Sequence, residues 1–288
     1  MNTLKFQQRR LLLAGVTGAA ALAVFFLTAC DSRTPKAGSE SSNSASAFDV
    51  AGSDPQAIAL ADSVMAACGG KENWERTRFI TWDWFGKRLT VWDKWTGDLR
   101  IESRMSLVLM NMNTRQGRAW KTGHEITDKD GLKRAMDYGY EAWVNDAYWM
   151  ILPFKLKDGG VTLKYIKEDT TAEGQMADVI SMTFKNVGLT PNNKFHIYID
   201  KKSKLLVQWD FFRDAEDSQP HFFTPWKNYQ KFGNILLSND RGDGPRKIHV
   251  GLGVYDELPA SVFTSPDRID WHKIKSEFAA NPPKTLNN

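Results

Sequence analysis

Residues 79–112 read FITWDWFGKRLTVWDKWTGDLRIESRMSLVLMNM, and this stretch carries the clearest strand pattern of the chain. Apolar and aromatic residues alternate with polar ones over short runs, which is the period of β-strands and not of helices. Thr96-Gly97-Asp98 stands between two of the runs, where a tight reversal is expected. Neighbouring runs therefore predict consecutive strands that pair antiparallel.

The strand period recurs along much of the chain. Turn residues separate the runs, and Lys201-Lys202-Ser203 marks a second predicted reversal. The run 105–112 is apolar on both faces, so we expect it to lie inside a sheet and not at its edge. The predicted strands are 79–85, 88–95, 99–104, 105–112, 161–166, 179–184, 194–199, 205–212 and 235–239.

Helical spacing marks both ends of the folded part. Ser53 is the predicted N-cap of a first helix, which ends at Gly69-Gly70. Its apolar stripe includes Cys68, which is expected to pack as a small hydrophobe and not to react. Ser265-Pro266-Asp267 predicts the start of a last helix.

The segment from Asp128 to Pro153 interrupts the strands, because its apolar residues recur at helical spacing. Asn145-Asp146 can begin a fresh turn, and Pro153 prevents a helix from continuing past Leu152. The segment is therefore predicted to form a pair of short helices or one broken helix. A long antiparallel sheet with helices inserted on one side makes the predicted class α+β.

The first residues predict export and a lipid anchor. Lys5, Arg9 and Arg10 precede an apolar run over residues 11–27, which is the layout of a secretory signal peptide. The run ends in Leu27-Thr28-Ala29-Cys30, which resembles a bacterial lipobox. We therefore expect residues 1–29 to be a lipoprotein signal peptide and Cys30 to be lipidated, which would hold the protein on a membrane surface.

The export route and the membrane stay open. A transmembrane anchor that ends in Cys30 is an alternative, since the apolar run is nearly long enough to span a bilayer. Arg9-Arg10 also fits a twin-arginine export signal as well as a general secretory one. Asp31 resembles an inner-membrane retention signal, but this rule does not hold in every bacterial group, so the sequence does not choose between the inner and the outer membrane.

Composition divides the rest of the chain. Residues 30–52 are rich in small and polar residues, which is typical of a flexible tether behind the lipidated cysteine. Residues 53–278 have enough apolar residues to form one folded domain. Residues 279–288 carry two prolines and little to bury, so they are expected to form a loose tail.

Charge argues against a nucleic-acid partner. The chain has 38 Lys and Arg against 34 Asp and Glu, but three of the basic residues lie in the leader. The mature chain would keep 35 basic residues against 34 acidic ones, with the two signs interspersed. Binding to a phosphate backbone needs clustered positive charge, so no nucleic acid is expected.

The motifs of common metal sites are missing from the sequence. His124-Glu125 begins like a zinc-protease helix, but Asp128 stands where the second histidine is required. The loop 239–244 is expected to be a solvated turn and not a calcium site, because it lacks the alternating ligands. No metal and no cofactor is therefore expected. The remaining histidines without neighbours at ligand spacing are His196, His221, His249 and His272.

Catalytic signatures are equally scarce. Asp83, Asp93 and Asp98 lie near tryptophans, which leaves glycoside chemistry as a minor alternative. The sequence gives no distance between them, and outward-facing charges on strands are ordinary. The chain is therefore expected not to be an enzyme.

Tryptophan is the unusual feature of the composition, with 11 in the chain. Most are expected to fill a core. Trp82 and Trp84 share one strand face, while Trp143 and Trp149 lie on the helical segment. A groove lined by such side chains would suit an apolar ligand.

Four stretches carry a resemblance to a known family: residues 68–74, 82–88, 92–97 and 145–160. Together they resemble a family of bacterial envelope lipoproteins that looks like a member of the lipoprotein-localisation superfamily, typified by LolA and LolB. The likeness covers roughly residues 53–263, and the segment from Asn145 to Gly160, NDAYWMILPFKLKDGG, is its most specific part. The chain departs from the soluble carrier LolA by having its own lipobox.

The resemblance implies an incomplete barrel, in which helices cover the concave face of a curved antiparallel sheet around an apolar cavity. It implies a membrane-anchored lipoprotein of the bacterial envelope, on the periplasmic side, whose half-barrel binds a lipid, an acyl chain or another apolar ligand. The alternative is a structural or interaction lipoprotein whose cavity is filled by its own side chains. The cavity and lid candidates are Trp82, Trp84, Trp143, Tyr148, Trp149 and Phe154.

Overall fold

The computed structural model describes residues 47–185, 187–242 and 251–278. The chain divides into two compact units, residues 1–43 and 44–288, and every described residue belongs to the second. The predicted signal peptide, Cys30, most of the predicted tether, His249 and the C-terminal tail lie outside the described residues. Within the described part, no helix combines the length and the apolar character that a membrane span requires.

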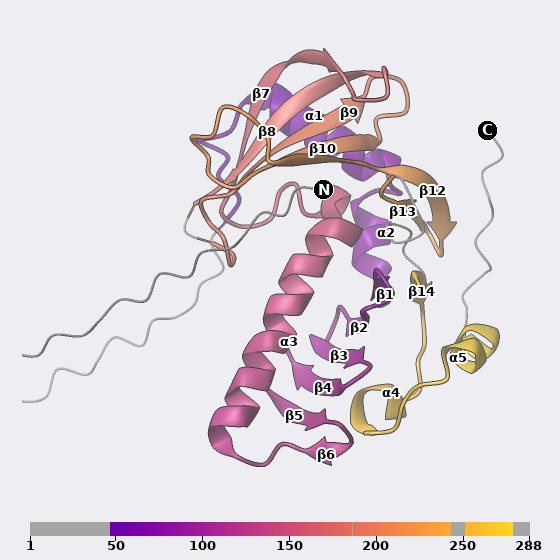
Figure 1. Ribbon diagram of the computed structural model, residues 1–288. Helices are drawn as coiled ribbons and strands as arrows, with labels where there is room; N and C mark the ends of the chain where they lie inside the picture. Colours follow the sequence, from indigo (N-terminus) through magenta and orange to yellow (C-terminus); the bar gives the residue numbers. More distant parts are fainter. Residues whose placement is uncertain (1–46, 186, 243–250, 279–288) are drawn as a thin grey trace, which may run out of the picture. The chain divides into compact units, whose positions relative to one another are not determined.

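The stretch that opened the sequence forms the centre of a seven-stranded antiparallel sheet, in the strand order β14-β1-β2-β3-β4-β5-β6 (Figure 1). The meander predicted for residues 79–112 is therefore confirmed. The strands β5, β6 and β14 were not predicted. The bounds are β1 Phe79–Trp84, β2 Arg88–Asp93, β3 Asp98–Ser103, β4 Ser106–Asn111, β5 Gln116–Lys121, β6 His124–Glu125 and β14 Gly253–Tyr255.

A second, five-stranded antiparallel sheet has the order β11-β10-β9-β8-β7, and β12 pairs with β13 in a separate hairpin. The one long sheet of the prediction is thus divided, and neither sheet closes on itself among the described strands. The class α+β with an open antiparallel arrangement is confirmed. The bounds are β7 Val161–Thr170, β8 Met176–Phe184, β9 Lys194–Asp200, β10 Leu206–Phe212, β11 Phe222–Pro225, β12 Lys227–Phe232 and β13 Ile235–Asp240.

Helix α3, Lys129–Met150, is continuous, so the predicted break at Asn145-Asp146 is wrong. Asp128 caps the helix by accepting a hydrogen bond from the Gly131 amide at 2.6 Å. Asp146 lies within the helix, and its fully buried side chain forms an ion pair with Arg88 on β2. The predicted end is confirmed, since α3 stops before the 3₁₀ turn Leu152–Phe154 that contains Pro153.

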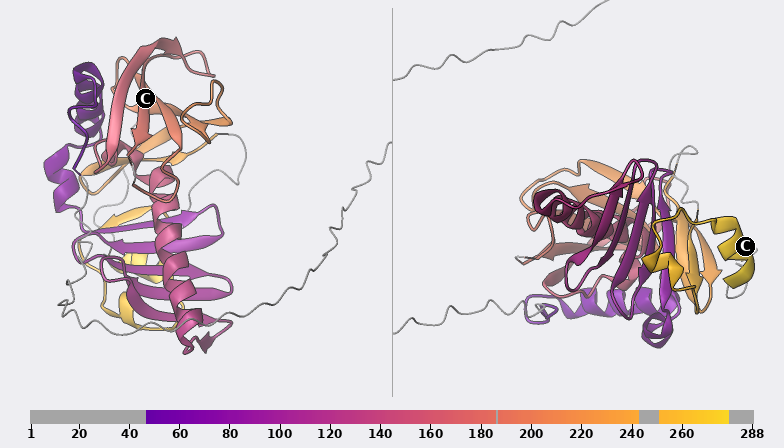
Figure 2. Two further views of the ribbon diagram at one scale, coloured as in Figure 1. Left: turned by 90° about the vertical axis from the view of Figure 1, so that its left-hand side faces the viewer. Right: turned by 90° about the horizontal axis from the view of Figure 1, so that it is seen from below.

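Helix α3 crosses the strands of the seven-stranded sheet and packs on β4 and β5 (Figures 1 and 2). A β-carbon at Gly139 would lie 2.7 Å from Met110 Sδ, so glycine allows the helix to approach this closely. On β4, Val108 and Met110 join the main core, while Leu107 and Leu109 pack with Trp120 on the other face. The prediction that this strand lies inside a sheet is confirmed.

Helices α1, Pro55–Ala67, and α2, Lys71–Arg76, precede the first strand. The N-cap of α1 is Asp54 and not Ser53. Ser53 is occupied elsewhere: its hydroxyl donates to the Asp49 carbonyl at 2.6 Å and accepts from the Leu163 amide at 2.9 Å. The Asp49 amide also donates to Val161 at 3.1 Å, so residues 47–52, expected to end the tether, contact the folded unit.

Two short helices, α4 Ser261–Thr264 and α5 Trp271–Phe278, lie on the opposite face of the seven-stranded sheet from α3 (Figure 2). The sequence predicts helices on one side of the sheet only, and this prediction is wrong because α4 and α5 cover the other face. The helix start predicted at Ser265 is also wrong, because α5 begins six residues later, at Trp271. Asp270 precedes the helix instead, and its side chain accepts hydrogen bonds from the His272 amide at 3.0 Å and the Lys273 amide at 3.1 Å.

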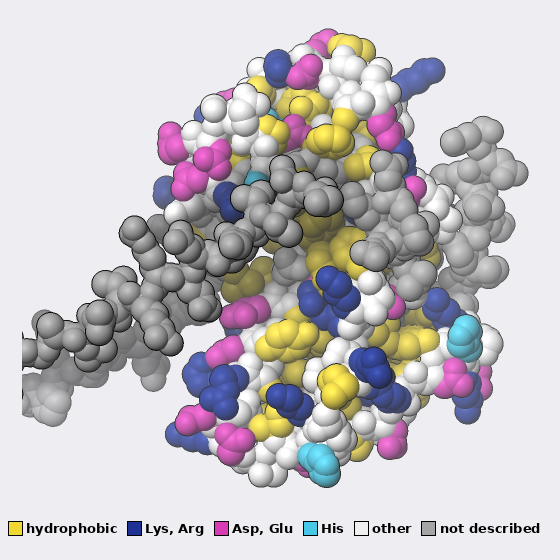
Figure 3. All heavy atoms as spheres, in the orientation of Figure 1, with side chains coloured by type: hydrophobic (Ala, Val, Ile, Leu, Met, Phe, Trp, Pro, Cys, Tyr) yellow, Lys and Arg dark blue, Asp and Glu magenta, His cyan; other side chains and the backbone are white. Residues whose placement is uncertain are grey.

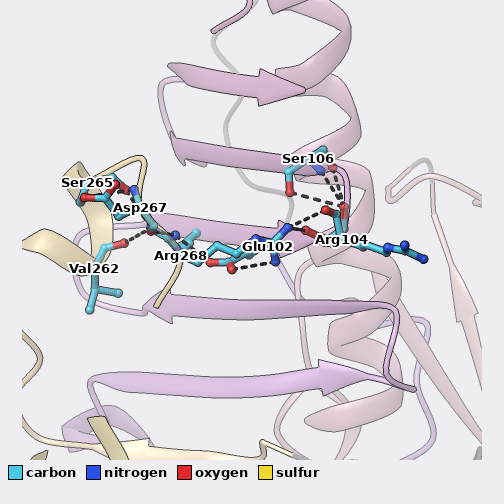
Figure 4. Close-up of polar contacts among 9 residues, drawn as sticks. Glu102, Arg104, Ser106, Val262, Ser265, Asp267 and Arg268 are labelled. Carbon is cyan, nitrogen blue, oxygen red and sulfur yellow. Dashed lines mark hydrogen bonds and ion pairs between the residues drawn. The ribbon is translucent and has the colours of Figure 1, made fainter. Parts of the chain in front are cut away.

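Arg100 fastens this C-terminal segment to the sheet. Its side chain on β3 is 0% exposed, and its Nη1 also donates to the Val262 carbonyl at 3.2 Å. Glu102 accepts from Arg100 Nε at 2.9 Å and from Arg268 Nη1 at 3.3 Å (Figure 4). Each of the three nitrogens of the buried Arg100 guanidinium thus donates to an acceptor on this face of the sheet.

Candidate functional site

A pocket of about 420 Å³ lies between the C-terminal end of α3 and the five-stranded sheet. Figure 3 shows apolar side chains gathered in a recess below this sheet. Helix α3 contributes Val144, Asn145, Tyr148 and Trp149 to the wall. The sheet contributes aromatic side chains from four strands, which are Phe184, Phe195, Trp209, Phe211 and Phe222.

The aromatic rings of the wall pack edge to face and face to face, which fixes their orientations. The Trp149 ring packs edge to face with two other rings. The ring centroids are separated by 4.9 Å for Trp149 and Trp209 and by 5.3 Å for Trp149 and Trp84. Trp209 stacks on Phe195 at 4.8 Å. The wall is therefore formed largely by rings that support one another across two sheets and a helix.

Polar groups are few along this pocket. None of its lining residues is Asp, Glu, Lys, Arg or His. Burial raises the pKa of the Tyr148 phenol above its ordinary value, so this hydroxyl is neutral at physiological pH. An interior without charged groups favours an apolar occupant, because an ion placed there would lose its hydration without gaining a partner.

The loop between β8 and β9 forms the open side of the pocket. Leu189 is 44% exposed there, and Phe222 on the edge strand β11 is 37% exposed. Asn193 donates to the Thr190 hydroxyl at 2.7 Å, which stabilises the turn. The mouth therefore combines exposed apolar side chains with neutral polar ones.

Arg88 and Asp146 hold the end of α3 that lines the pocket. Arg88 Nε donates to Asp146 Oδ2 at 2.9 Å, and Arg88 Nη2 donates to Oδ1. Burial raises the pKa of Asp146, and the hydrogen bonds from Arg88 act in the opposite direction. This fork joins β2 of the seven-stranded sheet to the last turns of the helix.

The structure brings together only half of the predicted cavity residues. Trp84, Tyr148 and Trp149 line the pocket. The other three candidates, Trp82, Trp143 and Phe154, do not line it and are buried in the core.

Packing explains why these three residues belong to the core. Trp143 packs against Trp92 with a centroid separation of 5.0 Å, and Phe154 stacks on Trp74 at 4.3 Å. Trp82 shares a face of β1 with Trp84, which is the last residue of the strand. Trp82 lies two residues earlier, where the core covers its side chain completely.

Sequence reasoning missed the wall that the five-stranded sheet supplies. Phe195 on β9 pairs with Phe211 on β10, and Trp209 on β10 pairs with Ile197 on β9. Both Phe195 and Trp209 belong to the main core. Their alternation with polar residues predicts an inward face. It does not distinguish a filled core from a cavity, because that depends on how far α3 stands from the sheet.

Two further residues considered from the sequence, Cys68 and Asp93, have structural roles. Burial raises the pKa of the Cys68 thiol to about 12, and the residue packs in the core as predicted. Asp93 accepts from Arg78 Nη2 at 3.0 Å. Arg241 is fully buried, so the prediction of a solvated turn is wrong at this position. Among the described residues, no group of three or more His, Cys, Asp or Glu side chains lies close enough together to hold a metal.

His196 gives the folded chain a predicted sensitivity to acid. Burial lowers the pKa of His196 to about 4, and Lys194 and Lys167 add to this effect. The unfolded chain takes up the proton near pH 6.5, whereas the folded chain resists it, so stability is expected to fall as the pH drops from about 6.5 to 4. In urea unfolding across this range, His196→Gln is expected to have the flatter profile. Equal slopes in both proteins would refute the assignment.

No protein-family model matches the chain, and no curated protein matches it. Two solved structures are similar over 72% of this chain and 96% of their own. One is a DUF1329 family protein from Desulfovibrio piger, with 13% identity and a TM-score of 0.38. The other is a putative outer membrane lipoprotein-sorting protein domain from Vibrio parahaemolyticus, with 11% identity and a TM-score of 0.36.

Proposed function

We propose that this chain is a lipid-anchored protein of the bacterial envelope that binds an acyl chain or another apolar molecule in the pocket between α3 and the five-stranded sheet. The observation that carries the proposal is a cavity of about 420 Å³ lined by aromatic and aliphatic side chains, with no ionised group among them. Pockets of this size and character are typical of small-ligand sites. Binding, and not turnover, is the proposed activity.

The energetics of the pocket favour a hydrocarbon chain. Each methylene group moved from water into such a cavity gains about 0.8 kcal/mol. The rings of Trp149, Trp209 and Phe195 already support one another, so little side-chain entropy remains to be lost on binding. A ligand with a charged head would have to leave that head at the mouth, beside Thr190 and Asn193.

The leader supplies the proposed location. The apolar run before Cys30 and the lipobox-like Leu27-Thr28-Ala29-Cys30 favour a lipoprotein that stays on the periplasmic side of a membrane. Mass spectrometry of the purified mature protein would test this directly. A diacylglyceryl and acyl addition on Cys30 is expected, and an unmodified cysteine would contradict it.

Phe222 and Phe223 offer a matched test of the pocket. Both are on β11 and exposed, at 37% and 54%, but only Phe222 lines the pocket, where its ring lies 5.0 Å from that of Phe211. Phe222→Ser is expected to weaken binding of a fluorescent fatty acid roughly tenfold, because a large apolar contact is lost. Phe223→Ser should leave the dissociation constant unchanged. The measurement is a fluorescence titration of the chain from Ser44 onward, which forms the second compact unit.

Two outcomes would count against the proposal. If the wild-type unit takes up no probe and no lipid appears in a solvent extract of it, the pocket does not hold an acyl chain. If Phe222→Ser and Phe223→Ser weaken binding equally, the probe binds to exposed apolar surface and not in the pocket.

A further inference from the structure

Arg241 follows β13 and is completely buried beneath the pocket. Its guanidinium donates from Nε to the Trp149 carbonyl at 3.1 Å, and its Nη2 donates to the same oxygen. The other hydrogen bonds go to Ser238 Oγ at 2.6 Å, the Ser238 carbonyl at 3.1 Å and the Asp240 carbonyl at 3.0 Å. All of its acceptors are therefore neutral oxygens.

The Trp149 carbonyl belongs to the last turn of α3, Lys129–Met150. The final carbonyls of a helix lack partners within the helix, and the negative end of the helix dipole lies there. A cation at this end stabilises the turn and satisfies an otherwise unpaired oxygen. Arg241 thus caps the helix from a different part of the chain, 92 residues away in sequence.

The contact reaches the pocket wall through two aromatic rings. The Arg241 guanidinium lies 3.5 Å from the centroid of the Trp226 ring. Trp226 meets the edge of Trp209 at 6.4 Å, and Trp209 in turn meets Trp149 at 4.9 Å. Arg241 therefore touches the helix that carries Trp149, and through Trp226 it also supports the Trp209 ring against which Trp149 packs.

We propose that Arg241 is a positioning residue for the apolar pocket, which fixes the last turn of α3 and the Trp149 ring at the distance from the five-stranded sheet that leaves the cavity open. This inference rests on the proposed function for its binding readout. Arg88 holds the same helix one turn earlier, through the side chain of Asp146. Arg241 instead binds the backbone carbonyl of Trp149, and its hydrogen bonds also extend to Ser238 on β13.

Arginine is needed here because of its shape. Its planar fork donates in several directions at once, and its face stacks on an aromatic ring, neither of which a lysine ammonium reproduces. Arg241→Lys keeps the long aliphatic stem but cannot make both the Trp149 and the Ser238 contacts in this geometry, and burial lowers the pKa of a lysine more readily than that of an arginine. The substitution therefore tests whether the fork of hydrogen bonds positions the end of α3.

Arg100 provides a matched control. It too is 0% exposed and donates to backbone carbonyls, but on the outer face of the other sheet and away from the pocket lining. Arg100→Lys and Arg241→Lys should both lower stability. Only Arg241→Lys should move the wall of the pocket.

The experiment compares wild type, Arg241→Lys and Arg100→Lys in the unit from Ser44 onward, at a temperature where all three are folded. Two quantities are measured: the dissociation constant for a fluorescent fatty acid, and hydrogen exchange of the amides of residues 146–151. Arg241→Lys is expected to raise the dissociation constant for the probe about tenfold, which is the size of effect expected from the loss of hydrogen bonds made by a charged group. It should also speed exchange at 146–151 about tenfold, and Arg100→Lys should change neither.

The outcomes separate this inference from the proposed function. Exchange at residues 146–151 that stays as slow in Arg241→Lys as in wild type would overturn the positioning role, whether or not any probe binds. Faster exchange together with unchanged probe affinity would overturn the link to the pocket. A wild-type unit that binds no probe would defeat the proposed function, and the exchange measurement would still decide whether Arg241 fixes the helix end.

Discussion

Asp146→Ala is expected to lower the free energy of unfolding by about 3 to 5 kcal/mol, the usual cost of removing one partner from a buried ion pair. Asp146 on α3 is 0% exposed, and the side chain of its partner Arg88 is 15% exposed. Alanine would leave the guanidinium with little water and without its carboxylate. The free energy is obtained from urea unfolding followed by circular dichroism.

The double variant Arg88→Met with Asp146→Leu is the matched control. Replacing both members of a buried ion pair by apolar side chains of similar size is often neutral or stabilising. The double variant is therefore expected to regain most of the stability that Asp146→Ala loses. If it is as unstable as the single variant, the unpaired charge is not the cause. A loss of less than about 1 kcal/mol in Asp146→Ala would show that water reaches the pair.

Trp82→Ala is expected to have an effect of similar size, about 3 to 5 kcal/mol, because it opens a large cavity in a close-packed core. Trp82 is fully buried and does not line the pocket. Its removal should therefore lower the urea midpoint and leave the affinity for a fluorescent fatty acid unchanged, when this is measured well below the midpoint.

Trp149→Ala is the counterpart of this substitution. Trp149 is half-buried and lines the pocket, where it contacts Trp84 and Trp209. Its replacement is expected to lower the affinity for the acyl probe by more than tenfold, where each factor of ten corresponds to about 1.4 kcal/mol. It should lower the free energy of unfolding by less than Trp82→Ala does. If Trp149→Ala lowers stability without changing probe uptake, the wall is part of the core and the self-filled alternative is favoured.

The strands of the fold were largely predictable because alternation is a local signal. The runs at 79–112 and 194–212 pair with their neighbours through short turns, so sequence order determines which strands lie side by side. The sequence does not predict strands β5 and β12, because most of their residues are polar or exposed; β5 lies next to the edge strand β6, and β12 belongs to a two-stranded hairpin. Their formation depends on a neighbour whose hydrogen bonds they satisfy, and not on their own apolar pattern.

The pocket was only half predictable. Trp84, Tyr148 and Trp149 were identified because aromatic residues near a helix end and a strand end stand out in the sequence. Trp82 and Trp143 stand out equally, yet the core covers them. Residue type determines that a side chain leaves water, and the distance between two packed elements determines whether space remains beside it.

Local patterns in the chain predict the α+β class, the antiparallel meander, the end of α3 at Pro153 and the burial of Cys68, because each depends on neighbours within a few residues. The unbroken α3 and the burial of Asp146 and Arg241 follow only from the folded arrangement, since their partners, Arg88 and the Trp149 carbonyl, lie 58 and 92 residues away. A buried charge is stable only where a partner from elsewhere in the chain satisfies it. No local pattern shows such a partner, so the contacts that hold the pocket open become visible only in the folded chain.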